Sequence, residues 1–229
     1  MHLGILAGIA VLCALCCRAY RRFSLRRRRS FLCKIALSVL LIELARDLLI
    51  AAAGGDLRLY LPLHLCGLAI FIQLAAALHP TEYLYEPLYC LTLPGAVSAL
   101  LFPNWANLPA LHFLTVSSFL IHGLLVLFPL LLLTSGELVP NARRLPGCLA
   151  LVLAAAAAVH TVNRTLGTNY MFLEGPSPGS PLQFLARLPG RHGYFLGLLG
   201  LLLLVWTALY GIPALARCFV CRTGGRGRP

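Results

Sequence analysis

Charged residues are scarce in this sequence. They make up 11% of its 229 residues, whereas hydrophobic residues make up 59% and the mean hydropathy is +0.84. Because soluble domains carry about 25% charged residues, this composition excludes an ordinary soluble domain and indicates that lipid surrounds most of the chain. The sequence therefore predicts an all-α, polytopic membrane protein.

Acidic residues are scarcer still, so the formal net charge is +12. A strongly basic chain can be a nucleic-acid binder, but here the arginines cluster at the ends of hydrophobic segments and no soluble domain remains to hold a nucleic acid. The clustering is instead the topology signal of a membrane protein. We expect membrane lipids, and no nucleic acid, as partners.

Several functional motifs are also missing. The sequence has no nucleotide-binding loop, no HExxH metal motif and no redox-cofactor motif, so we predict neither a cofactor nor a metal. His64, His122 and His160 come from three separate segments, which gives no spacing evidence for a shared metal. No internal repeat is visible, which argues against transporters built from duplicated halves. Without paired extracytoplasmic cysteines, a disulfide framework is not expected.

Seven hydrophobic segments are each near the ~20 residues that a bilayer requires. They cover residues 1–17, 31–53, 59–79, 84–102, 111–134, 146–163 and 193–216. The first segment is short, and the fourth is weakened as a helix by Pro94 and Gly95. If either of these segments does not cross the membrane, the number of spans is six. We predict one membrane domain, residues 1–217, followed by a short basic tail, residues 218–229.

The basic residues predict an orientation. With seven spans, fourteen lysines and arginines fall on one side of the membrane and four on the other. The positive-inside rule then places the N-terminus outside and the tail in the cytoplasm. In a bacterial cell this membrane would be the cytoplasmic membrane.

Ionisable residues in the second, third and fifth segments are the best candidates for a functional site, because such groups are expensive in a membrane. Glu43, Arg46 and Asp47 share one helix face. The third segment opens Leu-Pro-Leu-His-Leu-Cys (61–66), which predicts Pro62 in the first helical turn and His64 and Cys66 on nearly opposite faces. His122 lies ~16 Å deep in the fifth segment.

The sixth segment and the following loop add polar residues at the same end. These residues are His160, Asn163, Asn169 and Tyr170. In the predicted topology four segments therefore bring polar groups to the outer half of the membrane, where an unpaired polar group would be costly. The sequence predicts either one shared site or, alternatively, a structural cluster that holds the helices together.

Three motifs resemble those of the YwaF family of bacterial integral membrane proteins. They are residues 61–66, Ile-His-Gly (121–123) and Gly-Thr-Asn-Tyr-Met-Phe-Leu (167–173), with Tyr85-Glu86 and Ala-Leu-Leu (99–101) between them. The resemblance runs from about residue 35 to residue 212. It implies a distant relationship to a eukaryotic transmembrane acyltransferase that remodels ether phospholipids.

The resemblance also implies site residues. That acyltransferase is described with a cysteine directly before the third-segment histidine and with a histidine in the fifth segment. His122 matches the second of these, whereas Leu63 stands where the cysteine is expected. Cys66 lies three residues further on, on the helix face of Leu63, and would replace the missing cysteine only if the pocket is displaced by one turn.

These observations support three hypotheses. The first is a lipid acyltransferase or acyl hydrolase acting on a phospholipid that enters sideways from the outer leaflet. In it His122 is the general base, Cys66, water or an alcohol is the nucleophile, and His64, Asn163 and Asn169 bind the head group or an oxyanion. Glu43, Asp47, His160 and Tyr170 complete the predicted substrate-binding set.

The second hypothesis is a proton-coupled transporter or channel that uses the same residues as a path. The third is a non-catalytic lipid-binding protein.

Overall fold

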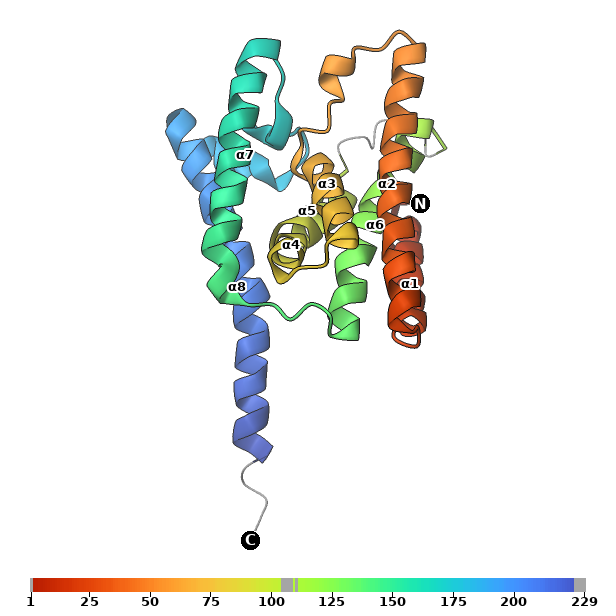
Figure 1. Cartoon of the computed structure of the whole chain (residues 1–229). Helices are drawn as coiled ribbons and strands as arrows, with labels where there is room; N and C mark the ends of the chain where they lie inside the picture. Colours follow the sequence, from red (N-terminus) through yellow and green to blue (C-terminus); the bar gives the residue numbers. More distant parts are fainter. Residues whose placement is uncertain (1, 104–108, 110, 225–229) are drawn as a thin grey trace.

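The computed structural model describes residues 2–103, 109 and 111–224, and within these residues the chain forms eight α-helices and no strand (Figure 1). The predicted all-α class is confirmed. The α-helices and the π turn are α1 (His2–Tyr20), α2 (Leu25–Ala52), α3 (Leu65–Leu78), α4 (Glu82–Pro87), η2 (Leu88–Thr92), α5 (Leu93–Leu101), α6 (Phe113–Ser135), α7 (Leu145–Leu166) and α8 (Gly190–Gly224). Short 3-10 turns lie in the connections: η1 (Leu57–Leu59), η3 (Ala142–Arg144), η4 (Tyr170–Phe172) and η5 (Pro181–Arg187).

Five stretches of the described chain are helical, long and apolar enough to cross a membrane. They are His2–Tyr20, Glu82–Leu101, Phe113–Ser135, Ala142–Leu166 and His192–Pro213. The helix α2 has 28 residues but carries many charges, and α3 is apolar but has only 14 residues. The multi-pass architecture is confirmed, whereas the count of seven spans is not.

The fourth predicted segment is one helical run with an irregular centre. Residues Leu88–Thr92 form a π-helical turn between Pro87 and Pro94. A proline has no N–H and cannot donate to the helical ladder, and an inserted π turn is a common way for a helix to absorb such an interruption. The irregularity therefore begins before the predicted position at Pro94 and Gly95.

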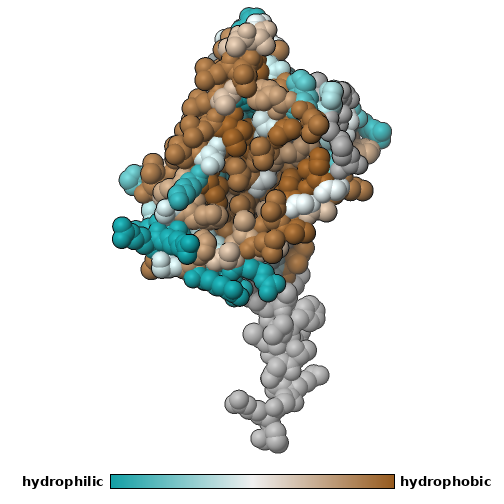
Figure 2. Space-filling model, turned by 90° about the vertical axis from the view of Figure 1, so that its right-hand side faces the viewer, coloured by the Kyte–Doolittle hydropathy of each residue, from teal (hydrophilic) through white to brown (hydrophobic). Residues whose placement is uncertain are grey.

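The bundle has two distinct ends. We call the side with the connections 53–64 and 167–189 the loop end, and the side with the connections 21–24 and 136–144 the arginine end. The loop-end connections meet where the Leu61 N–H donates to the Tyr170 hydroxyl (3.0 Å), and the arginine-end connections meet where Arg28 pairs with Glu137 (3.0 Å). Figure 2 shows apolar side chains over most of the height of one face and hydrophilic groups along its lower edge. This banding is what a membrane-embedded bundle requires.

The helix α6 is central, since it packs against α1, α2, α3 and α5. The helix α8 is attached to the run α4–η2 by hydrogen bonds near the arginine end. Trp206 donates to the Cys90 carbonyl (2.9 Å), Tyr89 donates to the Leu209 carbonyl (2.9 Å), and Tyr210 donates to Glu86 (2.5 Å). The Cys90 carbonyl lies in the π turn, so the indole of Trp206 satisfies an acceptor in the irregular part of that helix.

The C-terminal part of α8 extends to Gly224. The basic tail predicted for residues 218–229 therefore begins inside this helix rather than after it. Residues 225–229, with the predicted tail arginines Arg226 and Arg228, lie outside the described residues.

Candidate functional site

The helix α3 begins later than predicted. It starts at Leu65, and His64 is its N-cap residue with an extended backbone (φ −67°, ψ 155°). Pro62 therefore lies in the connection rather than in the first helical turn. The expectation that His64 and Cys66 point to opposite faces of one helix is also wrong, because only Cys66 is inside the helix.

A close backbone approach explains this shift. A Cβ atom placed on Gly67 would lie 2.7 Å from the Cα, C and O atoms of Pro62. The turn before α3 thus folds back onto the first helical turn, and glycine leaves the space that this contact needs. The contact between Pro62 and Gly67 helps to fix where α3 begins, and the amphipathic pattern of the sequence does not reveal it.

The ring of His64 is held by the loop that follows α7. The Met171 N–H donates a hydrogen bond to Nδ1 of His64 (3.2 Å), and the rings of Tyr170 and Phe172 lie 5.2 and 5.1 Å from the imidazole. Because Nδ1 accepts a hydrogen bond, the proton of a neutral His64 ring is on Nε2. The Nε2–H group of His64, on the side of the ring opposite Met171, is therefore a hydrogen-bond donor.

Asn163 organises that loop from the end of α7. Its side chain is buried, its Oδ1 accepts hydrogen bonds from the Tyr170 N–H (2.8 Å) and the Thr168 hydroxyl (2.9 Å), and its Nδ2 donates to the Tyr170 carbonyl (3.0 Å). Gly167 ends α7 in the left-handed conformation (φ 67°), as glycine commonly does. Asn163 is thus a loop-positioning residue.

Tyr170 joins the same loop to the connection before α3. Its hydroxyl donates to the Arg58 carbonyl and accepts from the Leu61 N–H. Burial raises the pKa of Tyr170, so the phenol remains a neutral donor over the physiological range. These bonds link residues more than a hundred positions apart in the chain and fix the entry to α3.

Two neighbouring residues in the loop have unusual backbone angles. Met171 and Phe172 both have φ near 55°, in the left-handed region that non-glycine residues seldom adopt. Such strain persists only where the surroundings impose it, and it concentrates at functional sites. Here the Met171 N–H is used by His64 and the Phe172 carbonyl accepts from the Tyr194 hydroxyl (2.9 Å).

The charged face of α2 forms an ion cluster, as its spacing predicts. Arg46 Nη2 pairs with Glu43 (2.5 Å) and with Asp47 (3.3 Å), and Glu43 is buried. The Nε atom of Arg46 is also buried and makes no hydrogen bond within the described residues. A buried donor left in this way marks a place where a polar ligand would be bound favourably.

His122 lies on α6, and its Nδ1 is 2.7 Å from the Ser118 carbonyl. A carbonyl oxygen only accepts, so Nδ1 carries the proton and a neutral His122 ring has its lone pair on Nε2. Arg46 interacts electrostatically with both His64 and His122, and the two histidines interact with each other. The helices that carry these residues, α2, α3 and α6, pack against one another.

Cys66 is the second residue of α3 and interacts electrostatically with Glu43. A nearby cation or histidine stabilises a thiolate, whereas the negative charge of a carboxylate such as Glu43 disfavours it. The position at a helix start is favourable for a thiolate, but its acidic neighbour is not. Cys66 is thus a weaker candidate nucleophile than its place at the helix start suggests.

His160 and Asn169 face a different part of the loop. The His160 ring is 2.7 Å from the Glu174 carboxylate and is 44% exposed. Asn169 accepts from the Glu174 N–H (2.9 Å) and donates to the Gly175 carbonyl (3.0 Å). Both residues therefore bind the 174–175 part of the loop, and His160 is not among the residues that line the cavity with His64.

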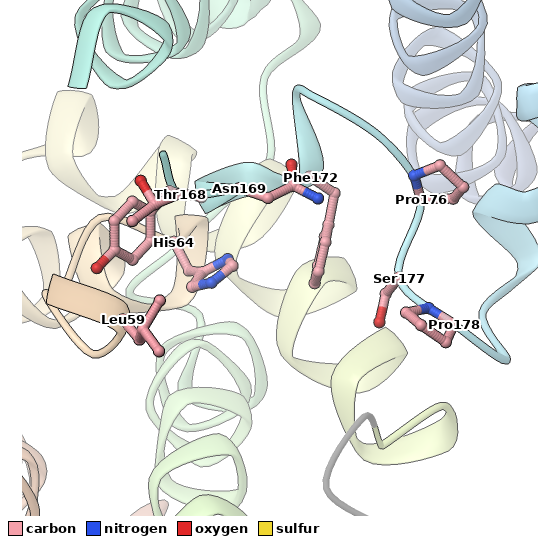
Figure 3. A pocket seen from close by; sticks show the side chains of 9 residues that line it. Leu59, His64, Thr168, Asn169, Phe172, Pro176, Ser177 and Pro178 are labelled. Carbon is pink, nitrogen blue, oxygen red and sulfur yellow. The ribbon is translucent and has the colours of Figure 1, made fainter. Parts of the chain in front are cut away.

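A cavity of about 310 Å³ opens at the loop end and reaches His64. In Figure 3 the side chains of His64 and Phe172 lie between the segment that carries Leu59 and the segment that carries Ser177 and Pro178. The complete lining is Leu59, His64, Thr168, Asn169, Tyr170, Phe172, Pro176, Ser177 and Pro178. His64 thus lines an open cavity whose walls carry both polar and apolar side chains.

The described residues contain no group of three or more histidines, cysteines or acids that could hold a metal ion. The site itself offers imidazole, guanidinium and carboxyl groups, with the thiol of Cys66 on the same helix start. Sequence reasoning missed Gly67, Phe172 and Ser177 as parts of the site. Only Gly67 and Phe172 lie in or beside the recognised motifs, so Ser177 had no local signal.

Comparison with known proteins gives one family. The model of the TMEM164 family matches residues 1–210. Neither the search of curated proteins nor the search of solved structures gives a match.

Proposed function

The chain belongs to the TMEM164 family, and we propose that it is a membrane-embedded lipid acyltransferase or acyl hydrolase. The proposed substrate is a phospholipid whose head group enters the loop-end cavity while its acyl chains remain in the surrounding leaflet. The orientation predicted from the arginines makes this the outer leaflet.

The observation that carries the proposal is the difference between the two histidines. His122 Nδ1 donates to a carbonyl, so its neutral ring has a basic Nε2, whereas His64 Nδ1 accepts from Met171 N–H, so its neutral ring has an acidic Nε2–H. Acyl transfer needs one base for the nucleophile and one donor for the developing oxyanion. The pair supplies both from neutral side chains.

The proposed step balances without a further reagent. Water or an alcohol attacks the acyl carbon while His122 accepts its proton, and the new carbon–oxygen bond forms as the ester carbonyl becomes an oxyanion. His64 Nε2–H stabilises that charge. The tetrahedral intermediate then expels the lipid alkoxide, which recovers the proton from His122.

The α2 cluster has a supporting role in this proposal. The charge of the Arg46 guanidinium acts on both histidines. The guanidinium itself forms ion pairs with Glu43 and Asp47. A guanidinium with a buried donor that no described residue uses is suited to a phosphate or carbonyl oxygen. Cys66 is the less suitable nucleophile, since its electrostatic neighbour is an acid.

The resemblance to the YwaF family and, through it, to an ether-phospholipid acyltransferase is consistent with this chemistry and stays a prediction. The positions of His64 and His122 agree with the motifs of that resemblance. The substitution of leucine at position 63 removes the expected cysteine, which favours direct attack by water or an alcohol over a cysteine intermediate.

One buried residue favours transport as a second candidate. Gln73 in α3 is fully buried, and neither its Oε1 nor its Nε2 makes a hydrogen bond within the described residues. It lies nine residues beyond His64, ~13 Å along the helix, so it could continue a polar path toward the arginine end. The transport hypothesis predicts that Gln73→Leu abolishes function, whereas acyl chemistry at His122 should continue.

Lipidomics tests the proposal in cells. Cells with the protein, without it, and with His122→Ala or His160→Ala at equal expression should be compared. We expect an altered phospholipid acyl pattern that His160→Ala retains and His122→Ala loses. An acyl pattern that does not depend on the protein would contradict the proposal.

A further inference from the structure

An apolar groove runs along the bundle between α1, α5 and α6, and it is separate from the loop-end cavity that reaches His64. Its volume is about 480 Å³, and its lining is formed by Leu6, Ile9, Ala10, Cys13, Ala14, Cys17, Val97, Leu100, Leu101, Val126, Leu130 and Thr134. The only polar side chain with oxygen in this lining, Thr134, donates within its own helix to the Leu130 carbonyl (2.7 Å). The side chains of the groove therefore offer a ligand only the thiols and the acceptor lone pairs of the Thr134 oxygen.

The shape of the groove follows from how α1 attaches to the bundle. The helix α1 packs principally on α6, which leaves α6 as the floor and α1 and the end of α5 as walls. Toward the loop end the walls are joined, because the His2 ring nitrogen Nε2 is 2.8 Å from the Leu100 carbonyl and the His2 ring lies 5.8 Å from that of Phe119. The groove thus runs along the helices from the His2–Leu100 contact toward the arginine end.

The dimensions of the groove suit one hydrocarbon chain. Leu6 and Cys17 are eleven residues apart on α1, which corresponds to ~16 Å at the helical rise. The hydrocarbon core of one leaflet is about half of the ~30 Å bilayer core. A groove of this length can hold one acyl chain along its own direction, and burial of the methylenes favours binding.

The groove also begins beside the proposed base. Gly123 follows His122, and a Cβ atom placed on Gly123 would lie 3.7 Å from the side chain of Ile9, which lines the groove. On the floor, Val126 lies one turn after His122, and Leu130 and Thr134 continue this row at intervals of four residues. A chain that lies in the groove therefore has one end beside the residue that the proposed chemistry uses.

We infer that the α1–α5–α6 groove binds the single acyl chain that is transferred or released, with its ester end toward His122 and its methyl end toward the arginine end. This inference rests on the proposed function and adds a chain-binding site to it. It assigns the head group to the His64 cavity and the reacting chain to a different surface of α6.

Cross-linking tests the groove independently of turnover. The full-length protein is reconstituted in lipid nanodiscs with a phosphatidylcholine that carries a diazirine within one acyl chain, and the cross-linked peptides are identified. We expect α1 and α6 peptides to predominate over those from the lipid-facing side of α8, which carries Leu204. Labelling spread evenly over α1, α7 and α8 would overturn the inference.

Two matched variants of α1 sharpen this test. Ala10 and Ala7 are both exposed and lie on the same helix, but only Ala10 lines the groove. Ala10→Trp should lower α1–α6 cross-linking about tenfold, which corresponds to roughly 1.4 kcal/mol of binding, and Ala7→Trp should leave it unchanged. Equal effects of the two variants would contradict the inference.

The test separates the two proposals. His122→Ala should abolish acyl turnover and leave cross-linking in the groove intact. If α1–α6 cross-linking predominates but no turnover occurs with any lipid, the groove stands and the proposed enzyme fails. If turnover depends on His122 but cross-linking is even over the surface, the enzyme stands and the groove fails.

Discussion

The Met171 N–H donates a hydrogen bond to Nδ1 of His64, so a residue in the loop after α7 sets the tautomer of a residue at the start of α3. The two residues are 107 positions apart in the chain. This bond holds His64 at the wall of the loop-end cavity. It forms where the backbone of Met171 and Phe172 has the strained left-handed conformation. The activity of His64 should therefore depend on Asn163 and Tyr170, which bind the part of the loop next to Met171.

Asn163→Ala removes the side chain that binds both the N–H and the carbonyl of Tyr170. Leaving such buried groups unsatisfied costs about 2 kcal/mol, and the loop should open locally. Hydrogen exchange should show faster exchange of the Tyr170 and Met171 amides, with helix α6 unchanged. Thr165→Ala is the matched control, because its hydroxyl bonds only within α7. Unchanged loop exchange in Asn163→Ala would contradict this role.

Gly67→Ala places a methyl group against the backbone of Pro62, at a distance that the present turn does not allow. The turn must move, at a cost of about 1–3 kcal/mol, and His64 should move with it. We expect a lower unfolding temperature in detergent and loss of most lipid turnover. Gly200→Ala is the control, since nothing lies within 4 Å of its Cβ position, and it should retain both properties.

Glu86→Ala tests the arginine end, away from the proposed chemistry. Glu86 is fully buried and accepts hydrogen bonds from the Asn141 N–H (3.0 Å), Arg144 (3.2 Å) and Tyr210 (2.5 Å). Its loss leaves three donors without this acceptor, so we expect a destabilisation of about 3 kcal/mol. Glu82→Ala removes a mostly exposed partner of Arg144 and should cost less than ~1 kcal/mol. Equal unfolding temperatures of the two variants would contradict this assignment.

Site-directed labelling tests the predicted orientation. Pro178 lines the loop-end cavity and is exposed, and Val139 is 65% exposed at the arginine end. A membrane-impermeant maleimide should label Pro178→Cys in intact cells but label Val139→Cys only after permeabilisation, with the parent chain as background. The reverse pattern would place the cavity on the cytoplasmic side.

Much of the helical architecture follows directly from the sequence, because the lipid environment forces long apolar runs into helices. The Glu43–Arg46–Asp47 ion cluster is also predictable from its spacing along the helix. The start of α3 is not, since the turn at 61–64 is fixed by Tyr170 and by the Pro62–Gly67 contact rather than by local propensity.

The separate location of His160 could not be predicted either. Its depth matches that of the other histidines, but α7 turns it toward Glu174 in its own following loop. Depth along a helix is readable from the sequence, whereas the direction in which a helix faces its neighbours depends on packing with the rest of the bundle. The groove on α6 likewise depends on how α1 packs against α6.

The most direct test of the account is acyl transfer by the purified protein in liposomes. The substrates are a phospholipid with an isotopically labelled acyl chain and either an unlabelled lysophospholipid or water as acceptor, with products measured by mass spectrometry. We predict labelled transfer or release that falls at least ~100-fold in His122→Ala, as loss of a general base requires, and persists in His160→Ala. Equal turnover by the wild-type protein and folded His122→Ala would contradict the central claim.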